Sequence, residues 1–240
     1  MEKGKKHRSW IVLFLVVCVL TVLVLWGMKA FHSQAKAEVA VGDTLVFGHF
    51  EQDENAGNGP EEIVWRVLAK SEDGERALVI SEQALERRVY QEGYIAANWE
   101  DCTLRMWLNE AFYADAFTEK EREAIAATKI EPEAIEGTDV DPGNATEDHV
   151  FLLSIAEADV YFSSAEDRIC TPTAHALAQG AYSYKGSNAC WWWLRTPGSD
   201  CNVAARVVGD GSIIASGCVN EELYCVRPAM WISLEAVGAK

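Results

Sequence analysis

The chain has 240 residues, of which 49% are hydrophobic, 24% are charged and 10% are aromatic. This length and apolar content suffice for one sizeable core, and they exclude a disordered chain, a collagen-like repeat and a coiled coil. The net charge of −16 is uneven, because residues 1–36 carry +5 and residues 37–240 carry −21. Phosphate backbones repel so acidic a body, which excludes nucleic acid as the main partner.

The first element that the sequence predicts is a membrane helix. Trp10–Met28 carries no charge, and Thr21 is its one polar side chain. At about 1.5 Å per residue it is roughly 28 Å long, close to the hydrocarbon thickness of a bilayer. Lys and Arg residues precede it, and positive charge stays on the cytoplasmic side. We therefore expect a single-pass protein of the cell membrane with four parts: a cytoplasmic basic tail at 1–9, a transmembrane helix at 10–28, a linker at 29–38 and an extracytoplasmic domain at 39–240.

A cleaved signal peptide is the alternative interpretation of the same segment. Ala35 and Ala37 form a small-x-small pattern before Glu38. The apolar run is longer than the usual signal-peptide core of about 7–15 residues, which favours an uncleaved anchor. Either interpretation places the body outside the cytoplasm.

The body begins with predicted strands. Thr44–Gly48 has strand composition, and two β-rich runs, Ile63–Ala69 and Ala77–Ile80, flank the turn pair Asp73–Gly74. They predict a strand followed by a β-hairpin.

Helices are predicted in the middle of the chain. Apolar residues recur with helical spacing from Leu104 to Phe112. Capping boxes are predicted at Thr118 with Glu121, for a helix through Ala127, and at Ser154 with Glu157. A short helix through Ala176 is expected from Thr171 as N-cap, Pro172 and the terminator Gly180.

The last third returns to β structure. Trp191–Leu194 predicts a strand, and Gly209–Gly211 predicts a hairpin turn between Ala204–Val208 and Ser212–Ala215. The final strand, Tyr224–Ile232, contains Pro228 and is therefore expected at an edge or with a kink. Strands, then helices, then strands indicate an α+β domain.

The body holds six cysteines, and an even number in an exported domain predicts disulfides. Six cysteines allow 15 pairings, and buried free thiols are the alternative. None of the six forms a CxxC pair, so we expect no zinc site. They are Cys102, Cys170, Cys190, Cys201, Cys218 and Cys225.

Several motifs in a fixed order resemble an uncharacterised bacterial extracytoplasmic domain family. They are Val41–Thr44, Ile63–Trp65, Cys102–Asn109, Val150–Ser154, Cys190–Gly198, Val208–Ser212, Gly217–Val219 and Val226–Ile232. The resemblance implies a single domain with a fold like that of C-type lectins and formylglycine-generating enzymes, in which a scaffold presents a variable C-terminal surface. The family has no established activity, so the resemblance implies architecture rather than chemistry.

A ligand site is predicted in two C-terminal loops, Pro197–Asn202 and Ser216–Tyr224. They are rich in the small polar residues that suit turns and adaptable hydrogen bonds. One Trp of the triple is the candidate platform, while burial of all three in the core is the alternative. The predicted ligand-binding residues are Trp192, Asp200, Asn202, Asn220 and Tyr224.

Other constellations carry two interpretations each. Arg195 and Arg227 lie in apolar surroundings, which favours structural pairing over anion recognition. The loop Asp139–Asp148 is rich in oxygen ligands that suit calcium, or it is a solvated acidic turn. His49, His149 and His175 lie near no catalytic motif, so we expect no catalytic residues and no cofactor.

The first functional hypothesis is therefore a membrane-anchored extracytoplasmic domain that binds an unknown ligand, either a glycan or a protein. The alternatives are a purely structural envelope protein and a thiol- or copper-dependent enzyme of the formylglycine-generating type. The enzyme hypothesis rests on Cys218 and Cys225, whose spacing and flanking residues differ from those of that family. Oligomeric state is left open by the sequence.

Overall fold

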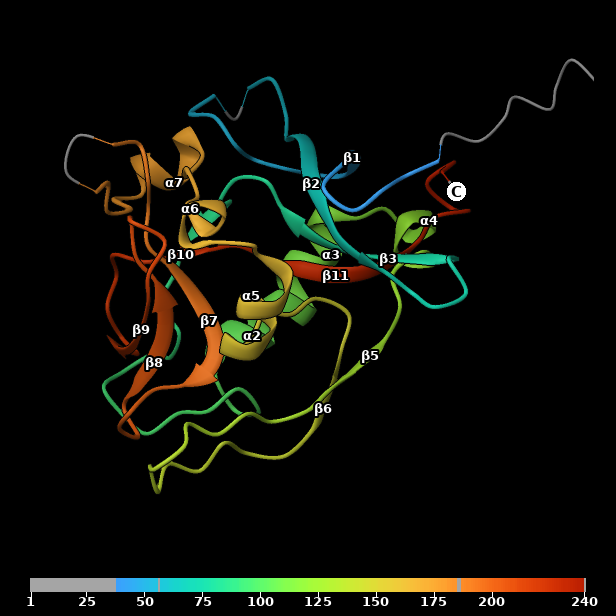
Figure 1. The fold of residues 1–240 in the computed structure, drawn as a ribbon. Coiled ribbons are helices and arrows are strands. Elements are labelled where there is room, and N and C mark those ends of the chain that lie inside the picture. The colour runs from blue at the N-terminus through green and yellow to red at the C-terminus, as the bar shows by residue number, and fades with distance from the viewer. Residues whose placement is uncertain (1–37, 56, 185–186, 240) are drawn as a thin grey trace, which may run out of the picture. The chain divides into compact units, whose positions relative to one another are not determined.

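The fold is known from a computed structural model that describes residues 38–55, 57–184 and 187–239 (Figure 1). The membrane helix predicted at 10–28 lies outside the described residues. No helix within them is long and apolar enough to span a bilayer. We therefore withdraw the predicted single-pass membrane location.

One sheet combines the first strands of the body with the last one. Its four antiparallel strands have the order β1-β2-β3-β11, and the hairpin predicted at Asp73–Gly74 is confirmed between β2 and β3. Figure 1 shows β11, near the end of the chain, beside β3. The strands are β1 (Thr44–Phe50), β2 (Glu61–Lys70), β3 (Arg76–Ser81) and β11 (Ala229–Ser233).

A second sheet is built mainly from the C-terminal third. Its order is β4-β10-β7-β8-β9, and the predicted hairpin around Gly209–Gly211 joins β8 to β9. Its strands are β4 (Glu86–Arg87), β7 (Trp192–Pro197), β8 (Val203–Val207), β9 (Ile213–Cys218) and β10 (Cys225–Val226). A separate ribbon pairs β5 (Thr128–Ile130) with β6 (Thr146–Asp148).

The predicted strand Tyr224–Ile232 is divided between the two sheets at Arg227–Pro228. Pro228 lacks an N–H donor, but its carbonyl accepts a hydrogen bond from Ser81 N of β3 at 3.0 Å. The Arg227 side chain is buried, and its Nε donates to Ser81 O at 2.8 Å. The expected kink is therefore a crossing from β10 in one sheet to β11 in the other.

The described helices are short. The predicted helical stripe forms a continuous helical run made of α2 (Thr103–Trp107), the π-turn η1 (Leu108–Phe112) and α3 (Tyr113–Ala116). Both predicted capping boxes are confirmed, at the starts of α4 (Glu119–Arg122) and α5 (Ile155–Tyr161). The others are α6 (Ala165–Arg168) and α7 (Ala174–Ala178).

The expected α+β class is wrong, because most regular structure in the described residues is β-strand. The helix predicted through Ala127 ends at Arg122, since the chain beyond it bonds to β11: Ala126 N donates to Trp231 O at 2.9 Å. Likewise α7 begins later than predicted, with Thr173 as its N-cap. The residues before it pair with Ala84, whose N–H donates to Thr171 O.

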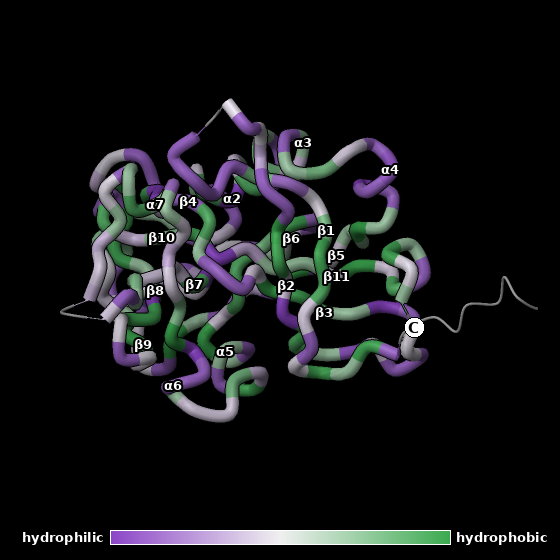
Figure 2. The backbone as a smooth tube through the Cα atoms, turned by 90° about the horizontal axis from the view of Figure 1, so that it is seen from above, coloured by the Kyte–Doolittle hydropathy of each residue, from purple (hydrophilic) through white to green (hydrophobic). Residues whose placement is uncertain are grey.

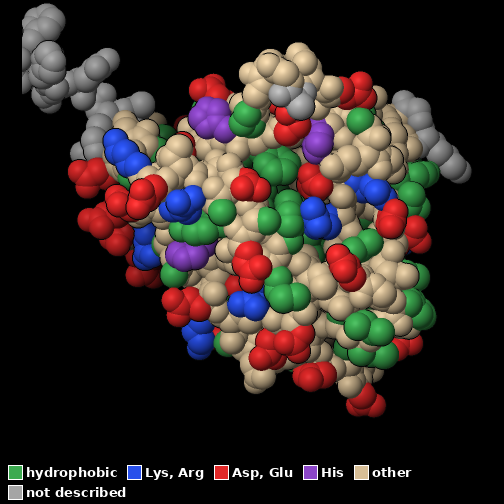
Figure 3. Space-filling model, turned by 180° about the vertical axis from the view of Figure 1, so that it is seen from behind, with side chains coloured by type: hydrophobic (Ala, Val, Ile, Leu, Met, Phe, Trp, Pro, Cys, Tyr) green, Lys and Arg blue, Asp and Glu red, His purple; other side chains and the backbone are tan. Residues whose placement is uncertain are grey.

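The core lies between and along the two sheets, and hydrophobic stretches (green in Figure 2) follow the interior strands, whereas α4 is hydrophilic. Trp65, Trp192 and Trp193 are fully buried. Acidic side chains spread over the face seen in Figure 3, where Lys and Arg are fewer. The negative charge of the body is thus carried by its surface.

We expect Gly211→Ala to be far more destabilising than Gly74→Ala. Both glycines have positive φ, at 82° and 72°, so alanine costs about 1–2 kcal/mol in backbone strain at either position. At Gly211 the added Cβ would also collide with the carbonyl of Ala165, whereas Gly74 faces open space. That overpacking adds about 1–3 kcal/mol. Urea unfolding of both variants measures the difference, and equal losses of stability would contradict the prediction.

Candidate functional site

The leading candidate site is a hollow at the edge of the five-stranded sheet, named here the β4 hollow. Its volume is about 320 Å³. The lining residues come from three chain segments: Glu86, Arg87, Arg88 and Val89 from β4 and the turn after it, Gln179 after α7, and Glu222 before β10. Concave sites with convergent polar groups are the usual place for ligand binding.

Backbone hydrogen bonds hold these three segments together. Leu85 N donates to Val226 O at 3.0 Å and Arg88 N donates to Tyr224 O at 3.1 Å, which fixes β4 against β10. The Gln179 side chain closes the other side, because its Oε1 accepts from Arg87 N at 3.1 Å. Gly180 follows with φ of 98°, a conformation that lets α7 end there.

A buried carboxylate lies at the centre of this arrangement. Glu86 is 7% exposed, and its oxygens face an amide, an imidazole and a guanidinium. Oε1 accepts from Gln179 Nε2 at 3.1 Å and lies 3.6 Å from Arg88 Nη2, while Oε2 lies 3.4 Å from His175 Nε2. The hydrogen bond from Gln179 holds Oε1, and Gln179 Nε2 also lies 3.0 Å from His175 Nε2, so the amide links the carboxylate to the imidazole.

Two arginines complete the polar lining. Arg87 Nη1 donates to both the carbonyl and the carboxylate of Glu222, at 2.6 and 2.9 Å. The Arg88 guanidinium lies 4.3 Å from the centre of the Trp107 ring. The Nε atoms of both arginines are buried without a hydrogen-bond partner, while their side chains remain 25% and 34% exposed. The hollow therefore presents guanidinium groups at its surface above a fixed anion.

A second hollow, of about 410 Å³, lies beside α4 and includes Phe47 and Glu121 in its lining. Glu121 is already committed to the capping box of α4, where its carboxylate accepts from Thr118 N and Oγ1. The lining of this hollow is more apolar than that of the β4 hollow, because Phe47, Ala124 and Ala236 belong to it.

The structure brings together only part of the site predicted from sequence. Val219 N donates to Asn202 O at 3.1 Å, which brings the backbone next to Asn220 close to Asn202. Exposed Asp200 lies in the same loop as Asn202. Tyr224 is 5% exposed and precedes Cys225, which pairs with Trp192 toward the opposite end of β8. The predicted loops are also shorter than expected, because Pro197 belongs to β7 and 216–218 belong to β9.

Trp192 is a wrong prediction as a platform, because it is fully buried against Phe162 and Arg227. Trp191 is the partly exposed member of the triple and lies 4.5 Å from Tyr182 between ring centres. Strand alternation correctly separates Trp192 from its two neighbours. It does not say which face is covered by further elements.

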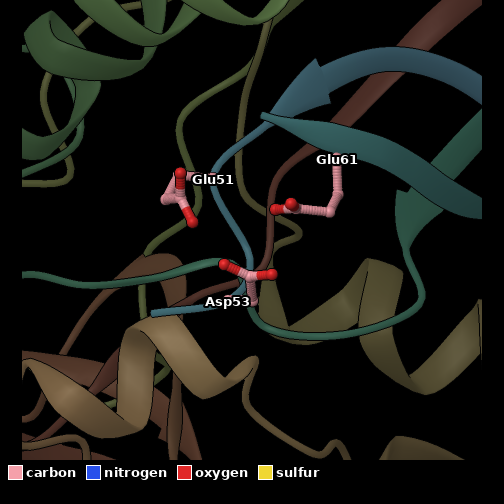
Figure 4. Close-up of side chains that lie close together, drawn as sticks. All are labelled: Glu51, Asp53 and Glu61. Atoms are coloured by element: carbon pink, nitrogen blue, oxygen red, sulfur yellow. The ribbon is translucent and has the colours of Figure 1, made fainter. Parts of the chain in front are cut away.

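An acidic cluster at the β1–β2 connection was not predicted from the sequence. Figure 4 shows Glu51, Asp53 and Glu61 converging, and their carboxylate oxygens lie within 4.8 Å of one another. Burial, together with the charge of Glu61, raises the pKa of Glu51. The loop Asp139–Asp148, predicted as a possible calcium site, differs from this cluster. Its Asp148 is buried, and Oδ1 of that residue accepts from Arg105 Nε at 2.7 Å.

The structure gives no support to the predicted disulfides, because the six cysteines of the described residues are free thiols. Burial raises the pKa of Cys102 to about 12 and that of Cys170 well above its usual range. Cys225 is buried and lies opposite Trp192 in the register of β10 and β7, whereas Cys218 lies opposite Val203 in the register of β9 and β8. These two cysteines occupy different register positions in the sheet and form no exposed convergent pair.

The two arginines expected in structural roles have them. Arg195 is 6% exposed, donates to Leu152 O at 2.8 Å and forms an ion pair with Glu157 of α5. Arg227 is held by Ser81 and two aromatic rings. Neither is available to a ligand.

Comparison with known families agrees with the resemblance seen in the sequence. Residues 74–234 match a family described as a domain of unknown function (DUF6273). The chain belongs to this family. No curated protein and no solved structure matches the chain. The expectation of an uncharacterised domain family is thus confirmed, while the C-type-lectin-like or formylglycine-generating-enzyme-like fold is not.

We expect Glu51→Gln to stabilise the protein at pH 7 and to have no effect near pH 4. The raised pKa means that the charged form of Glu51 is disfavoured in the folded state. The stability of the protein therefore falls as the pH rises above the ordinary pKa of a glutamate side chain. Glutamine removes that charge permanently. Thermal unfolding at both pH values measures the effect, and the control is Glu62→Gln, an exposed neighbour on β2. A stabilisation that is the same at pH 4 would contradict this account.

We expect Asp200→Asn to accelerate alkylation of Cys201. A hydrogen bond with Asp200, together with its charge, raises the pKa of the exposed Cys201 thiol. Without that carboxylate more thiolate is present at pH 7.5, and the rate with neutral iodoacetamide rises. Mass spectrometry of the Cys201 peptide gives the rate. Asp210→Asn, at another exposed loop carboxylate, is the control and leaves the rate unchanged.

Proposed function

We propose that this domain binds a small polar ligand in the β4 hollow, and that the ligand is a hydroxyl-rich molecule of the glycan class. The observation that carries the proposal is the buried Glu86 carboxylate, which accepts a hydrogen bond from Gln179 and lies beneath two partly exposed arginines. A protein gains from such a fixed charge where a ligand must be oriented by hydrogen bonds.

The size and lining of the hollow favour a glycan over a protein partner. A volume of about 320 Å³ is at the small end of ligand sites and suits one or two sugar rings. Val89 is its one apolar lining residue, whereas protein interfaces centre on large apolar or aromatic anchors. The guanidinium donors and carboxylate acceptors of the lining match hydroxyl groups, which both donate and accept hydrogen bonds.

Fewer observations support the alternative of an enzyme of the formylglycine-generating type. It needs two accessible cysteines that converge, and Cys218 and Cys225 occupy separate positions, with Cys225 buried. The structural alternative predicts no specific ligand at all, so a binding assay separates it from the proposal.

A glycan array probed with the full chain tests the proposal. We expect a small set of related glycans to bind, and Glu86→Gln to weaken their binding by tenfold or more. The charged carboxylate holds Gln179 and Arg88 in the lining of the hollow, and a hydrogen bond to a charged group contributes about 1.5–3 kcal/mol. Glu123→Gln is the matched control, because this exposed glutamate lines the other hollow. Circular dichroism checks that the Glu86 variant folds.

Two outcomes would refute this assignment. One is an array without any saturable binder. The other is a folded Glu86→Gln variant that binds as tightly as the wild type, which would place the ligand elsewhere on the domain.

A further inference from the structure

Arg206 is the unusual cation of this acidic domain. Six other arginines each have a carboxylate within ion-pair distance: Arg66, Arg87, Arg88, Arg105, Arg168 and Arg195. Among the described residues, no carboxylate and no hydrogen-bond acceptor partners Arg206, although the body carries a net charge of −21. Arg122 and Arg227 also lack a carboxylate, but both donate to backbone carbonyls, and Arg76 is exposed to solvent. Arg206 differs from them because it is partly buried without any acceptor.

The Arg206 guanidinium is held in place by aromatic rings and by the neighbouring strand. Its central carbon lies 5.3 Å from the centre of the Trp191 ring and 4.9 Å from that of Tyr224. A Cβ at Gly217 of β9 would lie 2.8 Å from Nη1. The same Cβ would lie 2.8 Å from Cζ3 of Trp193, so the guanidinium and the indole both lie against β9 at a residue without a side chain.

The hydrogen-bonding capacity of this group is unused. Nε and Nη1 of Arg206 are buried without partners, and so is Nε1 of Trp191. Arg206 as a whole is partly exposed. By elimination, Nη2 is the guanidinium nitrogen that reaches the surface. A cation that is ordered, half-desolvated and unpaired favours an anion more strongly than a fully hydrated one does.

We propose that Arg206 anchors an anion-binding site, the Arg206 site, which takes a carboxylate or phosphate group carried on a small ligand. Trp191 and Tyr224 hold the guanidinium in a fixed orientation, and half-buried Tyr182 packs against Trp191 at its border. The ligand oxyanion pairs with Nη2 at the surface.

The Arg206 site is separate from the β4 hollow and does not rest on the function proposed for it. The two share no side chain. They are neighbours, because the Tyr224 carbonyl accepts from Arg88 N. A ligand with both a charged group and hydroxyls therefore has complementary groups at both places, but either site can fail without the other.

The indole N–H signal of Trp191 in ¹⁵N spectra of the full chain tests the Arg206 site. The probes are glucuronate, glucose 6-phosphate and glucose, each at constant ionic strength. We expect a saturable shift of the Trp191 signal with one or both charged sugars and none with glucose. Which of the two acts decides between carboxylate and phosphate. Trp191→Phe assigns the signal.

Substitutions then separate this site from general charge effects. Arg206→Gln should weaken the response about tenfold, whereas Arg76→Gln, at an exposed arginine of β3, should leave it unchanged. The indole of Trp65, which donates to Phe47 O, reports whether the Arg206 variant is folded. Glu86→Gln should leave the Trp191 shift intact even if it abolishes binding in the β4 hollow.

Three results would overturn the proposal. They are no shift with either charged sugar up to about 20 mM, a concentration well above weak millimolar dissociation constants, an equal shift with glucose, and a folded Arg206→Gln variant that responds like the wild type.

Discussion

The contact between Arg227–Pro228 and Ser81 holds the two sheets in one structure. Arg227 donates to Ser81 O, and the Pro228 carbonyl accepts from Ser81 N, so both backbone groups of one β3 residue are satisfied by the crossing segment. The guanidinium lies over Trp192 and Phe162, at 5.2 and 5.4 Å from the ring centres. A charge buried this deeply costs much free energy unless it is bonded and stacked, which makes the crossing point specific.

That crossing also determines where the candidate sites lie. Because the chain leaves the five-stranded sheet at Arg227, β10 is only two residues long and sits between β4 and β7. β4 is the edge strand of this sheet, and its polar side chains line the β4 hollow. Edge strands carry charges elsewhere as protection against aggregation. Here the charges surround a buried Glu86. Protection against aggregation does not require a buried carboxylate.

Two kinds of arginine environment occur around the tryptophan triple. On one face of β7, Arg227 is stacked on Trp192 and bonded to the backbone, and it is closed to solvent. On the other face, Arg206 is stacked on Trp191 and Tyr224, lacks any such bond and is partly exposed. The first arrangement stabilises the fold, and the second leaves hydrogen-bonding capacity for a ligand. The same residue types thus serve different roles because of what covers each face.

The sequence by itself determined the local elements, since these depend on neighbouring residues. The hairpin at Asp73–Gly74, the capping boxes of α4 and α5, and the alternation within 191–193 follow from turn chemistry, capping and strand geometry. The ordered motifs around the tryptophan triple also indicated an uncharacterised family.

Only the tertiary structure decided which elements pair and which side chains are covered. It divided the last strand between two sheets, ended α4 at Arg122 in favour of bonds to β11, and buried Trp192 while leaving Trp191 partly exposed. The β4 hollow could not be predicted from the sequence, because its lining residues come from distant segments near positions 86, 179 and 222. Glu86, Gln179 and Glu222 belong to no shared motif, and long-range pairing of β4 with β10 is what brings them together.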